Sequence, residues 1–552
     1  MKYDFIIIGA GSAGCVLANR LSADPSVSVL LLEAGGPDRK LEIHIPGAYS
    51  KLNRTAVDWG FRTEPQPHVD GRTLYLPRGK TLGGCSSTNA MAYIRGNRLD
   101  FDDWAAGGNE GWSYADILPY FIRSEHNEQI DRLDRRYHGT GGPLNVTYAT
   151  RFRTPLAQAF VQACVSAGIR ENHDFNGAEQ EGAGLFQFTI RNGRRHSTAT
   201  AFLKPVLSRP NLKVMTHAHT RRILLDGAGG TTRATGVEVI TGRNNTETVY
   251  ASREVIVSAG AFNSPQILML SGIGAADDLR RFGIDTVHDL PGVGQNLQDH
   301  LFTGVSSLCS QPVSANHSLK PFNQFRALVQ YVVSRKGPLT ISPLEANAFV
   351  KLPTATDRPN LQLHFAPVHL GEDYSADMYD LTTYPTTDGY TILPTLLKPQ
   401  SRGYVTLRSA NPLDAPLIQP NFLSAEADRQ LLLDGTRRAI ELMGTDAFGS
   451  YCQRLSMPPD CSSDDTIMAH IRKMVETVYH PVGTCKMGSD DMAVVDSRLR
   501  VRGIEGLRVA DASIMPTIVS GNTNAACIMI GEKASDLVLE GHRMEVRMGV
   551  NG

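Results

Sequence analysis

The chain has 552 residues, which suggests three or four domain-sized units, or two large interleaved ones, and excludes a single small module. Hydrophobic residues make up 41% of the chain and charged residues 20%, a mix that supports a large buried core and excludes a disordered protein. The 55 Lys and Arg nearly balance the 56 Asp and Glu, so the net charge of -1 provides no overall field to attract nucleic acid or an anionic membrane.

The cysteines and the hydropathy pattern exclude further classes of protein. Eight cysteines form neither a CxxC pair nor a dense framework, as is typical of reduced thiols in a cytoplasmic enzyme, and we expect no metal site. No stretch reaches the roughly 18 consecutive apolar residues of a membrane-spanning helix, so we expect no integral membrane segment. A cytoplasmic protein is therefore predicted, and peripheral association with a membrane is left open.

The first predicted elements form a β-α-β unit. Tyr3 to Ile8 is an apolar, β-branched run typical of a strand, Ser12 to Ser22 has apolar residues at helical spacing, and Val27 to Leu32 predicts a second strand. Parallel strands joined by such a short helical connection form a right-handed crossover. The chain therefore begins as a parallel α/β sheet.

Similar elements recur far along the chain. A predicted strand at Arg253 to Ser258 precedes a helix at Ser264 to Leu270. Near the end, a strand at Leu507 to Ala510 precedes a long helical pattern from Ala525 to Leu539. One sheet is therefore assembled from distant parts of the chain.

The segments between these pieces have a different character. Extended runs such as Leu361 to Phe365 and Gly403 to Leu407 alternate with loops, which predicts a second, largely antiparallel unit. Ser462 to Asp465 is a good helix N-cap, for a helix that runs to about Val478.

A glycine-rich fingerprint joins the first strand to the first helix. The string Gly9-Ala10-Gly11-Ser12-Ala13-Gly14 is GxGxxG in the context that a dinucleotide requires. Gly9 permits the tight turn, Gly11 lets a pyrophosphate approach the backbone, and Gly14 lets the helix pack closely on the strand. The free N–H groups at the helix N-terminus favour the phosphates.

Glu33 ends the second strand, 22 residues after Gly11 and directly before Ala34. Its carboxylate is expected to accept hydrogen bonds from ribose hydroxyls, and its charge argues against a 2′-phosphate and therefore against NADP. This unit alone does not distinguish NAD from FAD, because both use it.

Five further segments resemble the glucose-methanol-choline (GMC) flavoprotein oxidoreductases. Arg78 to Asn89 resembles the first signature of that family, and Gly260 to Gly272 resembles the second. Tyr479 to Thr484, Val509 to Pro516 and then Asn522 to Asn524 complete the set. The motifs run in family order and cover nearly the whole chain, and the similarity is greatest to the choline dehydrogenase-like branch.

The resemblance implies an α/β FAD-binding Rossmann-like domain interleaved with an α+β substrate domain built on a mostly antiparallel sheet. We place the FAD domain at residues 1–150, 211–304 and 476–545, and the substrate domain at residues 151–210 and 305–475. FAD is expected to be non-covalent, because Thr88 stands where some relatives tether the flavin to a histidine.

The resemblance also implies which residues contact FAD. The first signature would pass beside the flavin ring, Ala218 would meet the adenine through its backbone, and Asp511 and Ala512 would lie near the ribityl chain and the ring edge. The full expected set is Gly9, Gly11, Ser12, Ala13, Gly14, Glu33, Ala34, Gly83, Gly84, Asn89, Met91, Ala218, Asp511, Ala512, Asn522 and Thr523.

The chemistry requires a base near neutral pH, because the hydroxyl proton of an alcohol leaves as its hydride goes to flavin N5. His480 matches the catalytic histidine of the family, and Asn522 matches its partner. Glu345 aligns with an acid that contacts the quaternary ammonium in choline-oxidising relatives, but a structural carboxylate paired with a base is an equal reading. No aromatic cluster is evident near Glu345 in the sequence.

We therefore predict FAD-dependent oxidation of a primary alcohol to an aldehyde, with a quinone or another non-oxygen acceptor. The alternatives are an oxygen-using alcohol oxidase, choline dehydrogenase proper, an NAD-dependent dehydrogenase and a non-redox flavin lyase. The expected partners are a small-molecule alcohol and an electron acceptor (quinone, dye or oxygen), without nucleic acid.

Overall fold

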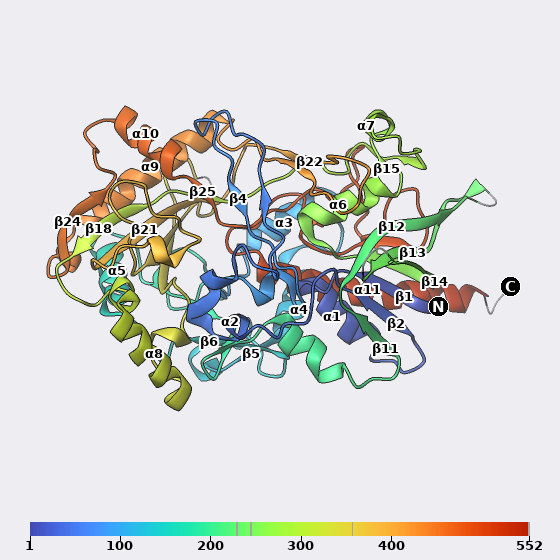
Figure 1. Ribbon diagram of the computed structural model, residues 1–552, viewed down its shortest axis with the longest axis horizontal. Helices are drawn as coiled ribbons and strands as arrows, with labels where there is room; N and C mark the ends of the chain where they lie inside the picture. Colours follow the sequence, from blue (N-terminus) through green and yellow to red (C-terminus); the bar gives the residue numbers. More distant parts are fainter. Residues whose placement is uncertain (228–229, 243–244, 356, 550–552) are drawn as a thin grey trace.

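Two sheets lie toward opposite ends of an elongated molecule (Figure 1). The computed structural model describes residues 1–227, 230–242, 245–355 and 357–549. The chain passes between the two sheets several times, so that each sheet contains strands from distant segments. The interleaved α/β and antiparallel architecture expected from the sequence is confirmed.

The first sheet has seven strands within the described residues, in the order β11-β2-β1-β14-β13-β12, with β26 also paired to β14. Five of the strands run parallel, and β12 and β13 form an antiparallel ribbon with the first part of β14. Their bounds are β1 Lys2–Ile8, β2 Val29–Leu32, β11 Leu212–Met215, β12 Ala218–Asp226, β13 Arg233–Thr241, β14 Asn245–Val257 and β26 Leu507–Val509.

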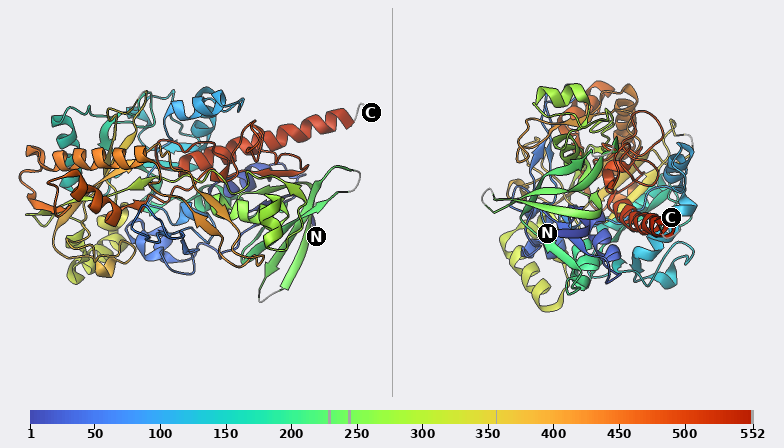
Figure 2. Two further views of the ribbon diagram at one scale, coloured as in Figure 1. Left: turned by 90° about the horizontal axis from the view of Figure 1, so that it is seen from above. Right: turned by 90° about the vertical axis from the view of Figure 1, so that its right-hand side faces the viewer.

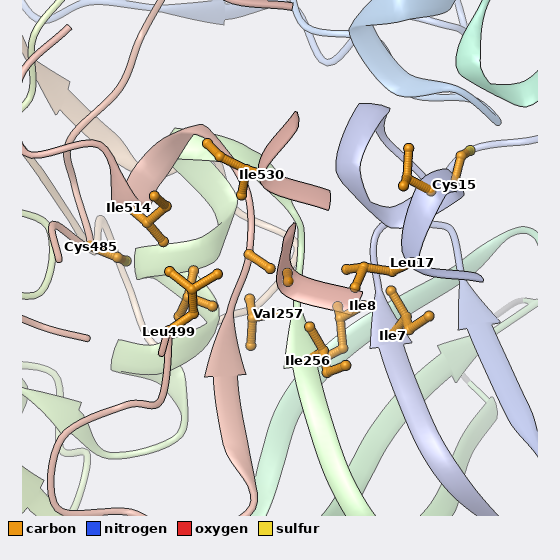
Figure 3. Packing of buried hydrophobic residues seen from close by; sticks show 14 of the residues in the cluster. Ile7, Ile8, Cys15, Leu17, Ile256, Val257, Cys485, Leu499, Ile514 and Ile530 are labelled. Carbon is orange, nitrogen blue, oxygen red and sulfur yellow. The ribbon is translucent and has the colours of Figure 1, made fainter. Parts of the chain in front are cut away.

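The parallel strands of this sheet bury apolar side chains on both faces of the sheet. Ile7 and Ile8 of β1 and Ile256 and Val257 of β14 are buried, as continuous apolar runs require when helices cover both faces of a parallel sheet. The helices α1 (Ser12–Leu21) and α11 (Asn524–Gly549) pack against each other beside these strands, and Figure 3 shows side chains from all four elements in one cluster.

The second sheet is antiparallel and has eight strands among the described residues, in the order β24-β18-β21-β20-β19-β7, with β17 pairing β21 and β25. The helices α5 (Pro155–Ser166) and α9 (Glu426–Met443) pack against it and bury a mostly aliphatic core. The strand bounds are β7 Gly182–Leu185, β17 Leu301–Phe302, β18 Val305–Cys309, β19 Ala346–Val350, β20 Leu361–Ala366, β21 Gly389–Leu396, β24 Cys452–Met457 and β25 Glu476–Thr477.

The remaining elements connect and cover the two sheets. Smaller sheets contain β3 Phe61–Arg62, β4 Tyr75–Leu76, β5 Glu125–Asn127, β6 Leu144–Tyr148, β8 Gln187–Phe188, β9 Ile190–Arg191, β10 Arg194–Arg195, β15 Ile273–Gly274, β16 His288–Asp289, β22 Tyr404–Thr406 and β23 Leu417–Gln419. The other helices are α2 Leu41–His44, α3 Arg98–Ala106, α4 Tyr114–Ser124, α5 Pro155–Ser166, α6 Gly260–Leu270, α7 Ala276–Arg281, α8 Pro321–Ser334, α9 Glu426–Met443 and α10 Asp464–Met474.

Two sequence predictions need correction. The helix predicted to reach Val478 ends at Met474, because Glu476–Thr477 leave it and pair with β17. The run Gly403 to Leu407 contains β22, but among the strands that the structure describes it pairs with β23 alone, and it packs near α6, outside the eight-stranded sheet. Tertiary pairing overrides the local pattern in both cases.

No helix in the part of the chain that the structure describes is both long and apolar enough to cross a membrane. In Figure 2, α11 extends outward from the body toward the C-terminus, and the N-terminus lies at the same end of the molecule, where the interior strand β1 begins.

Candidate active site

Residues from both sheets line one cavity, which has a nucleotide end and a histidine end. The nucleotide end is defined by Gly9, Gly11, Ser12, Glu33 and Ala218, all of which line it. These residues lie at the carboxyl edge of the parallel strands, where α/β sheets bind ligands. Ala13, Ala34, Asn89, Met91, Asp511, Ala512, Asn522 and Thr523 also line the cavity.

Gly14 does not line the cavity, and its surroundings explain why the motif requires a glycine there. A Cβ at this position would lie 1.9 Å from the carbonyl oxygen of Gly9, so any side chain would force α1 away from β1. The α1 N-terminus carries no side-chain cap, which leaves its first backbone N–H groups available for an anion.

Glu33 is buried, and both of its carboxylate oxygens already accept hydrogen bonds from the backbone. Ala10 N donates to Oε2 at 3.0 Å, and Gly35 N donates to Oε1 at 2.8 Å. Burial raises the pKa of Glu33 to about 7. Glu33 therefore holds the glycine loop to the end of β2, a role additional to the ribose contact predicted for it.

The first signature segment packs directly onto the glycine loop. Gly83 N donates to Ala10 O at 2.7 Å, and a Cβ on Gly84 would lie 2.8 Å from Gly11 Cα. Gly83 therefore lies behind the cavity, whereas Gly84 is part of its wall. Asn89 Oδ1 accepts from Met91 N at 3.0 Å and from the Arg195 guanidinium at 2.8 Å, which orients its amide.

The C-terminal motif brings two helix N-termini together. Asp511 accepts from Gly260 N and Ser513 N, each at 2.8 Å, and so joins the α6 N-terminus to the end of β26. Ser12 Oγ donates to Asn524 Oδ1 at 2.6 Å, which links the first turn of α1 to the first residue of α11.

The opposite end of the cavity, the histidine end, is defined by His364, His480 and Asn522. The His480 Nδ1 atom lies 3.0 Å from His300 Nδ1, and its Nε2 lies 3.3 Å from Asn522 Nδ2. Asn522 Oδ1 is buried without a hydrogen-bond partner among the described residues. His480 and Asn522, which are 42 residues apart in sequence, are therefore brought together.

The hydrogen bonds fix the proton positions on both rings. Leu397 O can only accept, so His300 Nε2, 3.1 Å away, carries a proton and His300 Nδ1 is the acceptor. His480 Nδ1–H therefore donates to His300, and its unprotonated Nε2 accepts from Asn522 Nδ2. Burial lowers the pKa of His480 well below its usual range, and His300 lowers it further.

The backbone around His480 is also held in place. His480 N donates to Asp299 Oδ1 at 2.8 Å, and Tyr479 N donates to Thr477 Oγ1 at 2.7 Å. Tyr479 has a φ of 64°, which is uncommon for a bulky residue and is maintained only where surrounding contacts determine it. These contacts direct the His480 ring toward the cavity.

Sequence reasoning missed two residues of this end. His364, on β20, lines the cavity, and its buried Nε2 has no hydrogen-bond partner among the described residues. His300 lies behind His480 and acts on it directly. The sequence contains a signal for each, a histidine in a buried strand and the Asp299-His300 pair, but nothing local connects either to Tyr479-His480.

Glu345 is not among the residues that line the cavity. Its Oε2 accepts from Thr154 Oγ1 at 2.7 Å and from Thr154 N at 3.0 Å, at the N-cap of α5. Burial raises the pKa of Glu345 to about 7. These contacts favour the structural reading of this carboxylate.

The wall around the histidine end is mostly apolar and aromatic. It contains Tyr49, Leu52, Phe302, Leu344, Val368, Leu370, Met378, Tyr379, Tyr384, Leu393 and Tyr479. The acidic residues that line the cavity in the described chain are Glu33, Asp58 and Asp511, and each already accepts from backbone N–H groups. No carboxylate among them remains without a donor.

The residues present fit FAD. The glycine loop, the uncapped α1 N-terminus and the close approach of Gly84 to Gly11 provide a backbone surface for a pyrophosphate. Across the described residues, no group of three or more His, Cys, Asp or Glu could hold a metal ion.

Fold and site together define a flavin-dependent oxidoreductase of α/β type with a histidine facing its cavity. The GMC oxidoreductase family models match residues 3–302 and 399–531, and the chain belongs to this family. Its members bind FAD, and this chain is an FAD-dependent oxidoreductase that acts on CH–OH donors.

Three known proteins illustrate the similarity. The chain is 46% identical to an alcohol dehydrogenase [acceptor] of Pseudomonas putida over 545 residues, covering 97% of this chain and 96% of that protein. It is 45% identical to an oxygen-dependent choline dehydrogenase of Brucella ovis, covering 98% and 96%. A solved structure concerned with FAD modification in Aspergillus oryzae RIB40 formate oxidase superposes with a TM-score of 0.91 at 29% identity, covering 98% and 99%.

Proposed function

We propose that this enzyme oxidises an uncharged primary alcohol to an aldehyde, with His480 as the base that accepts the hydroxyl proton. The observation that carries the proposal is the unprotonated Nε2 of His480, which accepts from Asn522 Nδ2 where both residues line the cavity. FAD, when bound, supplies the hydride acceptor.

The chain's own groups prepare the proton transfer. His300 keeps the proton of His480 on Nδ1, so Nε2 can accept the proton of the alcohol without a change of tautomer. The Asn522 amide can donate to the alcohol oxygen and orient it toward the same nitrogen. Because both groups act on one oxygen, their contributions to the rate are coupled.

The wall of the histidine end supports an uncharged substrate. Its side chains are apolar or aromatic, and every carboxylate of the described cavity lining already has backbone donors. A cationic alcohol would enter without an unpaired carboxylate to compensate its charge. Glu345, for which a contact with a cationic substrate and a structural role were equal readings, is held by Thr154.

A specific observation favours choline as the second candidate. Tyr49, Tyr379, Tyr384 and Tyr479 all line the cavity, and the rings of Tyr379 and Tyr479 lie 6.1 Å apart. Aromatic faces attract a quaternary ammonium even without a carboxylate. This aromatic group is invisible in the sequence, because its members come from three separate segments.

We further propose that FAD is bound without a covalent link and that a quinone or dye accepts electrons faster than oxygen does. Thr88, which lines the cavity at the tethering position, has no ring nitrogen for a link. The similarity to an acceptor-dependent alcohol dehydrogenase supports the choice of acceptor. Acid precipitation should release the flavin into the supernatant, and colour retained in the pellet would contradict the first point.

The test is anaerobic flavin bleaching by a panel of alcohols, followed by addition of a quinone or air. The matched pair is choline and its carbon isostere, in which a tert-butyl group replaces the trimethylammonium. We expect the isostere to bleach the flavin faster, and preference for choline would favour the second candidate. Peroxide formation that matches turnover in air would identify an oxidase, and failure of every alcohol would contradict the proposed reaction.

A further inference from the structure

Helix α8 presents an apolar face that nothing in the described chain covers. Phe322 is 76% exposed, Phe325 66%, Val332 65% and Val333 79%. Most exposed hydrophobic residues of soluble proteins occur singly, whereas here they are concentrated on one helix of 14 residues. Figures 1 and 2 show α8 at the periphery of the molecule.

The exposed side chains occupy one side of the helix. Phe322, Phe325, Val329 and Val332 follow each other at three- and four-residue spacing, which places them on one face. The buried residues Ala327 and Tyr331 lie on roughly the opposite face. The helix therefore packs on the protein through one face and exposes apolar side chains to solvent on the opposite face.

The charged residues of α8 and of the segments directly before and after it are all basic. From residue 300 to 344 the sequence has four basic residues, Lys320, Arg326, Arg335 and Lys336, and no Asp or Glu. Lys320 and Lys336 flank the two ends of α8 and are exposed. The net charge of the whole chain averages over the surface and conceals this local excess.

Charge decides between the possible occupants of the face. A second copy of the chain would bring the same four positive groups against each other, which disfavours self-association. An anionic lipid surface instead complements the charges and accepts the apolar side chains, as interfacial amphipathic helices do.

The position of α8 links it to the cavity. The helix packs on the short 3₁₀ helix Pro338–Thr340, which in turn packs on the 3₁₀ helix Pro46–Leu52. A Cβ on Gly47 would lie 2.9 Å from Leu339 Cα, which shows how close the second contact is. Tyr49 and Leu52 of that helix line the cavity.

We propose that α8, with Lys320 and Lys336 at its ends, docks the protein onto an anionic membrane surface, with its apolar face in the headgroup region. The binding is peripheral and places the histidine end of the cavity near the lipid. It does not depend on the alcohol or acceptor proposed above, because the test measures binding without turnover.

The experiment is sedimentation of the FAD-loaded protein with vesicles of phosphatidylcholine, with or without phosphatidylglycerol. Each basic residue near an anionic surface contributes about fivefold in affinity. We therefore expect binding at least about tenfold tighter to the anionic vesicles, and weaker binding as salt rises.

Two double variants separate the two contributions. Phe322→Gln with Phe325→Gln should weaken vesicle binding by about a hundredfold or more, because each Phe that leaves water contributes at least about tenfold. Lys320→Gln with Lys336→Gln should cost roughly twentyfold on anionic vesicles and little on neutral ones. Matched controls are Leu413→Gln with Val287→Gln, which are exposed apolar positions elsewhere, and Lys213→Gln.

Dye-linked turnover without vesicles should be unchanged in every variant, which separates this proposal from the proposed reaction. The proposal is overturned if the wild-type protein does not sediment with anionic vesicles, or if the control variants lose as much binding as the α8 variants. A dimer by light scattering that the Phe variant abolishes, without vesicle binding, would also overturn it and assign the face to self-association.

Discussion

The two ends of the cavity are built in different ways. At the nucleotide end, the contacts come mainly from backbone groups: the loop at Gly9 to Gly11, the uncapped start of α1 and the close approach of Gly84. At the histidine end, side chains do the work, and His300, His364 and His480 come from three distant segments. Binding at the nucleotide end therefore depends on the backbone conformation, whereas the chemistry at the histidine end depends on which ring nitrogens carry protons.

The difference predicts how each end responds to substitution. A change at the nucleotide end should alter FAD affinity and leave the chemistry of the loaded enzyme nearly unchanged. A change at the histidine end should slow the chemistry of the loaded enzyme and leave FAD affinity nearly unchanged. The following experiments test whether the two properties separate in this way.

The largest effect is expected for His480→Ala. General-base catalysis contributes on the order of 10² to 10⁴ in rate, so anaerobic flavin reduction should slow by about that factor while FAD remains bound. Stopped-flow absorbance measures the reduction. His470→Ala is the matched control, because His470 is a buried histidine that already contacts Tyr374 Oη and Gly304 O.

The Asn522→Ala variant should lose less than His480→Ala, and the double variant less than the product of the two losses, since both groups act on one oxygen. Reduction of His480→Ala at the wild-type rate would make the histidine structural and the proposed base wrong.

The next effect is expected for Glu33→Ala. Loss of hydrogen bonds to a charged group costs on the order of 1.5 to 3 kcal/mol, which is roughly ten- to a hundredfold in FAD affinity. Titration of the apoprotein with FAD measures the dissociation constant, with Glu238→Ala as control, because Glu238 is a half-buried carboxylate that pairs with Arg222 and does not line the cavity. Once saturated with FAD, Glu33→Ala should reduce its flavin within about twofold of the wild-type rate; a larger loss would break the separation of the two ends.

A smaller effect is expected for His300→Leu, which removes the acceptor for His480 Nδ1–H. A neutral hydrogen bond contributes about 0.5 to 1.5 kcal/mol, so reduction should slow by up to about tenfold. His300→Asn, whose Oδ1 can accept the same proton, should restore most of the rate. Equal losses in the two variants would show that His300 contributes only packing.

The smallest effect is expected from pH. The pKa of His480 is held well below its usual range by burial and by His300, so the base is already neutral at neutral pH. Protonation of Nε2 would remove the base, so the reduction rate should fall only on the acid side and stay flat, within about twofold, above pH 6.5 or so. A rate that climbed steadily through pH 7 and above would mean that another group provides the base.

The sequence predicted best where a motif is local. The β-α-β unit was placed to within two residues of β1, α1 and β2, because the glycines and the buried apolar runs act over short distances. The position of His480 next to Asn522 followed from family motifs. His300 and His364 were missed because they become part of the site only through the pairing of β17 and β20 with β21.

The structure also explains why Glu345 was ambiguous. Its local sequence does not reveal that Thr154, 191 residues away, donates to it twice. The tyrosines of the cavity escaped notice for the same reason, since a cluster assembled from distant segments leaves no pattern in any one of them.

The hydrogen bond between Ser12 and Asn524 spans 512 positions of the chain, and β26 joins β14 from the same distant segment. During synthesis on the ribosome, the glycine fingerprint emerges among the first residues. The cavity that it lines lacks Asn522 and the adjoining α11 until almost the entire polypeptide has been made. Contacts of such long sequence separation close slowly. The complete site therefore forms late, and a translation product that stops before residue 507 would carry the dinucleotide motif without β26 and α11.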